Sequence, residues 1–291
     1  MAKILITGGT GLVGKRLSQM LIGQNHDVLI LSRNPKKKNE YKWDLANNYI
    51  DKNALLETDY IIHLAGAGIA DKRWSEKRKQ VIIDSRVKTA NLLFKKIKEY
   101  KINLKGFISA SGIGYYGAIT SKTIFKETDT AGSDFLGEVC RKWENAAHQF
   151  ANLNIPVTIL RTGIVLAKEG GALDKMKTPI ISPLGTGIQY LAWIHIDDLC
   201  EMFITSIAAN LTGVFNAVAP ESHTSITFSK ALAKSIKRPY LGIGIPSFML
   251  RLLFGELSVI LLEGSRISAK KIEKNGYSFR FKTLKKALNN L

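Results

Sequence analysis

Cysteine is scarce in this 291-residue sequence, and no long uncharged apolar run is present. The two cysteines, Cys140 and Cys200, lack the CxxC or Cys/His spacing of a disulfide framework or a metal site, so we expect neither. The start of the chain has no apolar signal core with a small-residue cleavage site. The most apolar later segment, residues 245–262, contains Arg251 and Glu256, which would be costly at the centre of a bilayer. We therefore expect a cytoplasmic protein without membrane insertion, in which this segment forms a buried helix.

Acidic residues are few: the sequence has 24 of them against 42 lysines and arginines, a net charge of +18. The basic excess lies in residues 72–105, with twelve basic and three acidic residues, and in residues 266–291, with eight and one. In the first segment apolar residues recur with helical spacing, so its lysines belong to other, solvated faces. Aromatic residues are not interleaved with the lysines, as they are where proteins bind single-stranded nucleic acid. We expect a basic outer surface and no specific nucleic-acid site.

Strand-like segments alternate with helical patterns along the chain. This order is typical of an α/β fold in which helices cover both faces of a parallel sheet. The doubly wound pattern becomes irregular after about residue 165. We expect one domain over residues 1–165, to which later segments can return, and a smaller substrate lobe over residues 166–291. The expected strands are 3–7, 27–31, 60–64, 106–110, 157–161 and 214–217, and the expected helices are 12–23, 75–99, 137–152, 197–209, 226–236 and 247–262.

A glycine-rich segment, Thr-Gly-Gly-Thr-Gly-Leu-Val-Gly, follows the first expected strand and opens the first helix. Gly8 permits the tight turn, Gly11 lets a pyrophosphate approach the backbone, and Gly14 lets the helix pack on the strand. Leu12 and Val13 lie in the first helical turn, whose N-terminus would face the phosphates. A glycine-rich turn alone could be purely structural. Between this strand and this helix it predicts a Rossmann-type dinucleotide site.

The end of the second strand favours NADP(H) over NAD(H). An acidic residue there would bind the ribose 2′-hydroxyl and repel a 2′-phosphate, but this chain has Ser32 and Arg33. Arg33 can stack on adenine and contact the phosphate, Ser32 can donate a hydrogen bond, and the lysines at 36–38 add positive potential. The alternative is that Arg33 only opens a solvated basic loop.

Further motifs are spread over the whole chain. They are Thr-Gly-Gly-Thr-Gly at 7–11, His-Leu-Ala-Gly at 63–66, Arg-Trp at 73–74, Asp-Ser-Arg at 84–86, Ser-Ala-Ser at 109–111, Gly-Tyr-Tyr-Gly at 114–117, Asp-Phe-Leu at 134–136, Trp-Glu at 143–144, Leu-Arg-Thr-Gly at 160–163, Trp-Ile-His-Ile-Asp-Asp-Leu at 193–199 and Gly-Tyr-Ser-Phe-Arg at 276–280. In these motifs the chain resembles the extended short-chain dehydrogenase/reductases. The resemblance is to their atypical epimerase-like subgroup, the NAD-dependent epimerase/dehydratase or cell-division-inhibitor-like proteins. It implies a Rossmann cofactor domain and a smaller C-terminal substrate domain with a family-specific tail over about residues 240–291.

The resemblance also implies cofactor contacts beyond the glycine-rich turn. Leu64, Ala65 and Gly66 end a strand where small side chains let the adenosine side of the cofactor lie on the backbone. Arg86 stands where relatives have a cofactor-contacting Asn, and it could reach a phosphate or the nicotinamide ribose. Val165 would line the nicotinamide side. The alternatives are strand packing for the first three, an outward salt bridge for Arg86 and a core position for Val165.

The catalytic Tyr-xxx-Lys pair of the larger superfamily is missing. In that pair the tyrosine is the general acid/base, and the lysine lowers its pKa. Here Leu136 appears at the tyrosine position and Cys140 at the lysine position, and neither can do that work. Nothing adjacent in the sequence indicates a lowered pKa for Cys140, so we interpret it as an inert buried cysteine.

Four residues remain as candidates for chemistry near the expected nicotinamide site. Tyr116 could exchange a proton with a carbonyl or alcohol, with Tyr115 as its neighbour, while Ser111 could hydrogen-bond the same oxygen. His195 would come from the second lobe. Alternatively, the two tyrosines pack a glycine-rich loop and His195 caps the next helix.

Two functions from different classes fit these observations. The first is an NADP-dependent oxidoreductase or epimerase that acts on a small carbonyl or alcohol, with a rearranged acid/base apparatus. The second is a non-catalytic NADP(H)-binding protein that regulates or scaffolds a partner. Loss of the Tyr-xxx-Lys pair favours the second function. Retention of Ser111, the glycines and the polar residues near the site favours the first, which we take as the working hypothesis.

Overall fold

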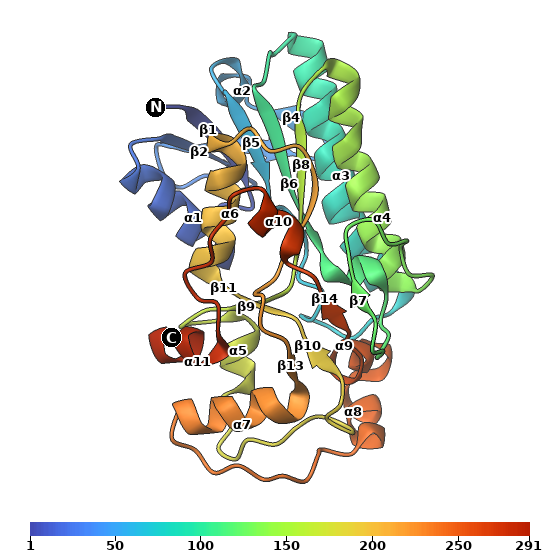
Figure 1. The fold of residues 1–291 in the computed structure, drawn as a ribbon. Coiled ribbons are helices and arrows are strands. Elements are labelled where there is room, and N and C mark those ends of the chain that lie inside the picture. Colours follow the sequence, from blue (N-terminus) through green and yellow to red (C-terminus); the bar gives the residue numbers. More distant parts are fainter.

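The computed structural model describes all 291 residues and is built around one eight-stranded sheet (Figure 1). Its strand order is β12-β8-β6-β5-β1-β2-β3-β4, and all neighbouring strands are parallel except β3 and β4. The chain winds outward in both directions from β1, so the ligand crevice lies at the carboxyl ends of β1 and β5. This arrangement confirms the expected doubly wound Rossmann fold. The strands are β1 (Lys3–Thr7), β2 (Asp27–Ser32), β3 (Glu40–Asp44), β4 (Tyr49–Ile50), β5 (Tyr60–His63), β6 (Gly106–Gly112), β8 (Val157–Thr162) and β12 (Gly213–Ala217).

Helices cover both faces of this sheet because successive strand residues point to opposite sides. Ile4 and Ile6 of β1 belong to one buried cluster, whereas Leu5 between them belongs to another. The first cluster includes residues of α1 and α6, and the second includes residues of α2, α3 and α4. The helices are α1 (Leu12–Gly23) and α6 (Ile196–Ala208) on the first face, and α2 (Asn53–Leu56), α3 (Glu76–Tyr100) and α4 (Phe135–His148) on the second.

Side-chain caps fix where the two long helices of the second face begin. Ser75 accepts a hydrogen bond from the backbone N–H of Arg78 at the start of α3. Asp134 accepts one from the N–H of Gly137 at the start of α4, at 2.9 Å. Each cap satisfies a backbone donor that the helix itself cannot pair. The caps therefore set the first turns of α3 and α4.

The C-terminal lobe lies below the sheet in Figure 1 and has its own core. Trp193, Phe228 and Phe281, from three separate segments, belong to that core. The chain enters this lobe after β8 but returns to the main sheet, because α6 packs beside α1 and β12 pairs with β8. The lobe contains β9 (Ile164–Leu166), α5 (Gly171–Met176), β10 (Tyr190–Leu191), β11 (Trp193–His195), β13 (His223–Thr224), α7 (Ser225–Ser235) and α11 (Leu284–Asn290).

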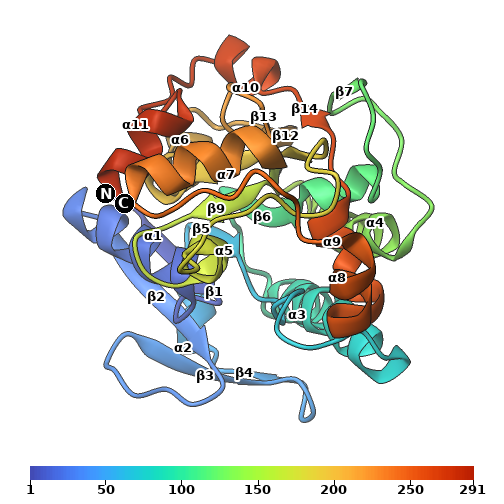
Figure 2. The same ribbon diagram turned by 90° about the horizontal axis from the view of Figure 1, so that it is seen from below.

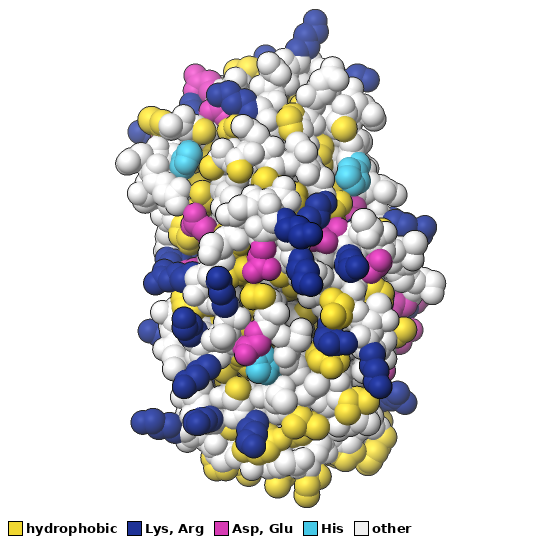
Figure 3. Space-filling model, in the orientation of Figure 1, with side chains coloured by type: hydrophobic (Ala, Val, Ile, Leu, Met, Phe, Trp, Pro, Cys, Tyr) yellow, Lys and Arg dark blue, Asp and Glu magenta, His cyan; other side chains and the backbone are white.

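The prediction of one buried helix over residues 247–262 is wrong. The segment is divided into α8 (Ser247–Phe254), a 3-10 turn η3 (Gly255–Ser258) and α9 (Val259–Leu262). Gly255 adopts φ +60°, a conformation that ends α8 and that glycine tolerates best. Leu252 is 77% exposed, and in α8 only Leu250 is buried. Figure 3 shows apolar side chains gathered at the lower end of the molecule, where Figure 1 places α7 and α8.

The tail after α9 runs back along the molecule. Its short strand β14 (Arg266–Ile267) pairs in parallel with β7 (Ile124–Phe125), and α10 (Lys270–Lys274) adds Ile272 to the core of the first sheet face. Seen from below, α8 and α9 lie beside α3 and α4 (Figure 2). No helix in the chain is both long enough and apolar enough to cross a bilayer.

Candidate functional site: a dinucleotide turn beside an apolar pocket

The glycine-rich turn between β1 and α1 is held against the end of β5. Gly8 has φ +70°, and a Cβ atom there would lie 2.9 Å from the carbonyl carbon of Leu64. A Cβ atom on Gly14 would lie 2.6 Å from the Cα atom of Gly9, so the helix can start this close only with glycine. Gly11 is the N-cap residue of α1, and no side chain caps this helix. The first-turn backbone donors, at Leu12 and the residues after it, are therefore open to a phosphate.

Replacing Gly14 by alanine is expected to weaken NADPH binding by about tenfold or more. The added methyl group must push α1 away from the turn, and overpacking of this kind costs about 1–3 kcal/mol. Gly23 at the other end of α1 supplies the control, because a Cβ there meets no atom within 4 Å. Calorimetric titration of both alanine variants with NADPH tests this. Equal affinity of the Gly14→Ala and Gly23→Ala variants would show that close packing at Gly14 does not shape the site.

A buried pair of polar side chains fixes the end of β5 below this turn. The Thr7 hydroxyl accepts hydrogen bonds from the N–H groups of Leu64 and Ala65 and lies 2.8 Å from Nδ1 of His63. Burial lowers the pKa of His63 to about 4, so the imidazole is neutral at neutral pH. We expect the hydroxyl to donate to Nδ1, since it already accepts from two backbone groups. No sequence pattern predicted this role of Thr7 and His63.

The β2 end carries the residues expected to choose the cofactor. The Ser32 hydroxyl accepts a hydrogen bond from the N–H of Asn34 at 3.2 Å, which orders the start of the following loop. Arg33 is exposed, and the structure gives its guanidinium no partner within the chain. Its charge is therefore available to a ligand.

Arg86 is a buried cation without a carboxylate partner. Its Nη1 donates to the carbonyl oxygens of Ala67 and Ile82 at 3.0 and 2.9 Å, and its guanidinium lies 4.8 Å from the Trp143 ring centroid. Burial lowers the pKa of Arg86 to about 10, and its Nε has no hydrogen-bond partner. A Cβ atom on Gly66 would lie 3.0 Å from the guanidinium carbon. Arg86 therefore points inward beneath the end of the Leu64–Gly66 segment, which rules out the alternative of an outward salt bridge.

Val165 and His195 lie on the neighbouring strands β9 and β11, with Val165 opposite Ile194 in the register. Nδ1 of His195 accepts the N–H of Asp197 at 3.1 Å and caps α6. The imidazole stacks on Phe281 at 3.7 Å between ring centroids, and burial lowers its pKa. The geometry of His195 thus matches the helix-capping alternative.

Ser111 and Tyr116 meet in a buried polar network centred on an ion pair. Glu144 of α4 and Arg161 of β8 form two parallel hydrogen bonds of 2.8 Å. The Ser111 hydroxyl donates to Glu144 at 2.7 Å, while Tyr116 donates to Oδ1 of Asn216 at 2.6 Å and accepts from Arg161 at 3.0 Å. Both hydroxyl groups are therefore engaged inside the protein.

The ionisation of this network follows from its burial. Burial disfavours the charge of Arg161, but the hydrogen bond and charge of Glu144 outweigh this effect and raise the pKa of Arg161. Burial also raises the pKa of Tyr116 to about 12, although Arg161 opposes the rise. Tyr116 is thus a weak acid that is held in place. Glu144 and Arg161 lie in sequence motifs that indicated no role for either residue. The position of Glu144 on the buried face of α4 was the signal that could have identified it.

Tyr115 differs from its neighbour. The Arg161 guanidinium carbon lies 3.3 Å from the centroid of the Tyr115 ring, which is only partly buried. The Tyr115 hydroxyl has no hydrogen-bond partner within the protein, and it is not fully buried. Nearby, burial raises the pKa of the Cys140 thiol to about 11, as expected for an inert cysteine.

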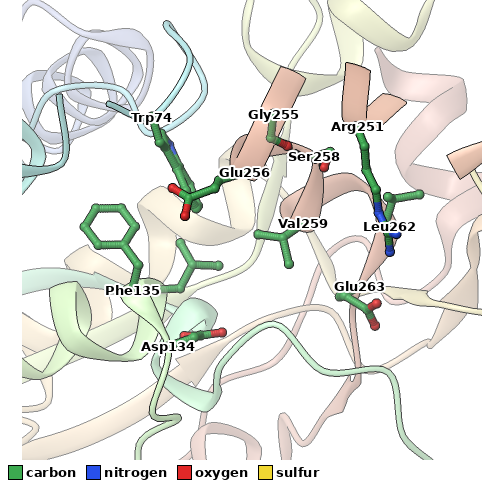
Figure 4. Close-up of a pocket in the computed structure, with 11 residues that line it drawn as sticks. Trp74, Asp134, Phe135, Arg251, Gly255, Glu256, Ser258, Val259, Leu262 and Glu263 are labelled. Atoms are coloured by element: carbon green, nitrogen blue, oxygen red, sulfur yellow. Dashed lines mark hydrogen bonds between the residues drawn. The ribbon is translucent and has the colours of Figure 1, made fainter. Parts of the chain in front are cut away.

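A pocket of about 550 Å³ opens where α4 begins (Figure 4). Trp74 and Phe135 line one side, and Arg251, Val259 and Leu262 come from α8 and α9 on the other. Leu136, the residue after Phe135 in α4, also lines the pocket. The sequence pattern predicts that Leu136 occupies the position of the superfamily's catalytic tyrosine, so we expect the pocket that it lines to adjoin the reaction centre. The segment that was expected to be a buried helix thus supplies one wall of a cavity.

Comparison with known proteins gives matches over the whole chain. Residues 4–217 match the NAD dependent epimerase/dehydratase family, and residues 245–291 match a domain of unknown function, DUF1731. An epimerase family protein of Staphylococcus saprophyticus is 34% identical over 100% of this chain and 99% of its own. The mouse epimerase family protein SDR39U1 is 32% identical over 99% of both chains. The crystal structure of human SDR39U1 with NADPH has a TM-score of 0.89 at 31% identity and covers 99% of this chain and 98% of that chain.

Proposed function

The chain belongs to the NAD dependent epimerase/dehydratase family, and from this premise we propose that it binds NADP(H) and oxidises or reduces a small carbonyl or alcohol. The observation that carries the proposal is the shared location of two features. The uncapped N-terminus of α1 and the pocket at Leu136 both follow carboxyl ends of parallel strands, where ligands bind in this fold. A regulatory or scaffolding protein would need the first feature but not an apolar-walled pocket beside the expected reaction centre.

NADP(H) is favoured over NAD(H) by the β2 end. Arg33 is exposed at the carboxyl end of β2, where no acidic residue stands. The human relative was crystallised with NADPH. Arg86 and Gly66 support the same site, because a buried unpaired guanidinium beneath a side-chain-free backbone suits an anionic or polar cofactor group. Val165 remains a candidate for the nicotinamide side.

We expect Arg33 to account for the preference for NADPH over NADH. Losing a charge-assisted phosphate contact costs about 1.5–3 kcal/mol, so Arg33→Ala is expected to weaken NADPH binding by about tenfold or more and to leave NADH binding nearly unchanged. Calorimetry of both cofactors measures this, with Arg141→Ala on the exposed side of α4 as the charge-matched control. Equal affinity of the parent protein for NADPH and NADH would refute the assignment.

We propose that Tyr115 is the proton donor for the reduction of a carbonyl compound. The N-terminus of α1 and Arg33 would hold NADPH, which would supply the hydride for reduction of the carbonyl carbon. The Tyr115 hydroxyl is free to donate a proton to the carbonyl oxygen, which completes the alcohol, and the stacked Arg161 guanidinium holds the tyrosine ring in place. Glu144 fixes Arg161 in this position. Ser111 and Tyr116 support the loop from within the network.

Loss of NADPH absorbance across a panel of aldehydes, ketones and keto-sugars tests this function. We expect turnover of at least one compound and none in the absence of protein. Tight NADPH binding without turnover of any compound would instead support the regulatory alternative.

A further inference from the structure

One wall of the pocket offers a ligand almost no polar partner. The rings of Trp74 and Phe135 meet edge to face at 4.9 Å between centroids. The indole N–H donates to the carbonyl oxygen of Ile69 at 2.9 Å, so Trp74 presents only its apolar surface to the cavity. Leu136 adds to the apolar lining next to Phe135, and Val259 contributes apolar surface from α9. A ligand that fills the pocket must therefore bury an apolar or aromatic body here.

The acidic residues of the pocket each have a partner within the protein. Glu256 forms an ion pair with Lys79 at 2.7 Å. Glu263 accepts a hydrogen bond from the Thr120 hydroxyl at 2.5 Å. Asp134 accepts backbone hydrogen bonds from Ala118 and Gly137 at the start of α4. These three carboxylates hold the walls together.

Arg251 is different, because it lines the pocket and forms no ion pair. Its side chain reaches from α8 toward Leu262 and Glu263, across the cavity from Phe135 (Figure 4). The Ser258 hydroxyl donates to the carbonyl oxygen of Gly255, so it is also engaged. Arg251 is thus the one cation among the lining side chains, and its guanidinium is free to bind a planar anion in two-point fashion.

We infer that this pocket selects an apolar or aromatic carbonyl or hydroxyl compound that carries a carboxylate, with Arg251 as the carboxylate's partner. The inference rests on the proposed function for the reaction but on the pocket alone for the ligand class. A nucleotide sugar fits these walls poorly, because its hydroxyl groups would face Trp74, Phe135 and Leu136 without partners. A neutral hydrocarbon would leave Arg251 unused.

Binding of matched small probes to the full-length protein saturated with NADP⁺ tests the ligand class without requiring turnover. We expect calorimetry to detect 4-phenylbutanoate and to give an affinity at least about tenfold weaker for the neutral 4-phenylbutanamide. Arg251→Gln should remove this difference by weakening the acid alone, whereas Phe135→Ala should weaken both probes. Arg141→Gln on the surface of α4 serves as the charge-matched control.

The outcomes separate this inference from the proposed function. Equal binding of acid and amide, or binding of UDP-glucose that depends on Trp74 while the acid does not bind, would overturn the ligand class. Arg251-dependent binding of the acid upholds the ligand class even if no carbonyl compound is reduced, and only the proposed reaction then fails. Turnover restricted to neutral carbonyl compounds would uphold the reaction and overturn the carboxylate requirement.

Discussion

Replacing Tyr115 by phenylalanine is expected to lower the turnover of a carbonyl substrate by about 10²–10⁴-fold, the usual contribution of a positioned general acid. NADPH affinity should change little, because the variant keeps the ring that stacks on Arg161. The loss should therefore appear in kcat rather than in cofactor binding. Steady-state kinetics with the best compound of the carbonyl panel, beside calorimetry with NADPH, measures both quantities.

Tyr116→Phe is the matched control for this experiment. It removes the hydrogen bonds to Asn216 and Arg161 and should destabilise the protein, but the Tyr115 hydroxyl remains. We expect a clearly smaller loss of turnover than in Tyr115→Phe. Full activity of the Tyr115→Phe variant, or a larger loss in Tyr116→Phe, would contradict the assignment of the proton donor.

Glu144→Gln is expected to destabilise the fold by about 3–5 kcal/mol, since removing one partner of a buried ion pair leaves an uncompensated charge. The side chains of Glu144 and Arg161 are 5% and 3% exposed, so water cannot solvate the remaining guanidinium. Urea denaturation followed by circular dichroism measures the free energy of unfolding.

The control for this substitution lies six residues earlier in the same helix. Glu138 pairs with Lys142, and both side chains are more than two-fifths exposed. Glu138→Gln should cost less than about 1 kcal/mol, as exposed pairs do. A similar small cost for Glu144→Gln would mean that the buried network does not hold Arg161 beneath Tyr115.

Local sequence patterns predicted the part of the fold that depends on near neighbours. The continuous apolar run of Ile4, Leu5 and Ile6 is typical of a strand buried on both faces, and the spacing of Gly8, Gly11 and Gly14 predicts the turn that follows. Both the strand and the turn depend on residues that are close together in the sequence. The comparisons with known proteins agree with the family resemblance carried by the longer motifs.

Contacts between distant segments could not be predicted in the same way. Ser111 and Tyr116 are polar residues beside a reaction centre, but their partners lie 33 and 100 residues further along the chain. Only the folded chain shows that both hydroxyl groups are already engaged. Likewise, the apolar residues after Ser247 resemble a core helix until Gly255 divides them and turns one part toward a pocket.

Isotope transfer tests the central claim, NADP(H)-dependent redox chemistry without a Tyr-xxx-Lys pair, most directly. The protein is loaded with NADPH that carries deuterium on one or the other face of nicotinamide carbon 4 and is incubated with a small-molecule extract of cells. We predict that mass spectrometry finds deuterium in a product from only one of the two labelled cofactors, and that the Tyr115→Phe variant forms far less of this product. Tight binding of NADPH without deuterium transfer to any compound would contradict the account.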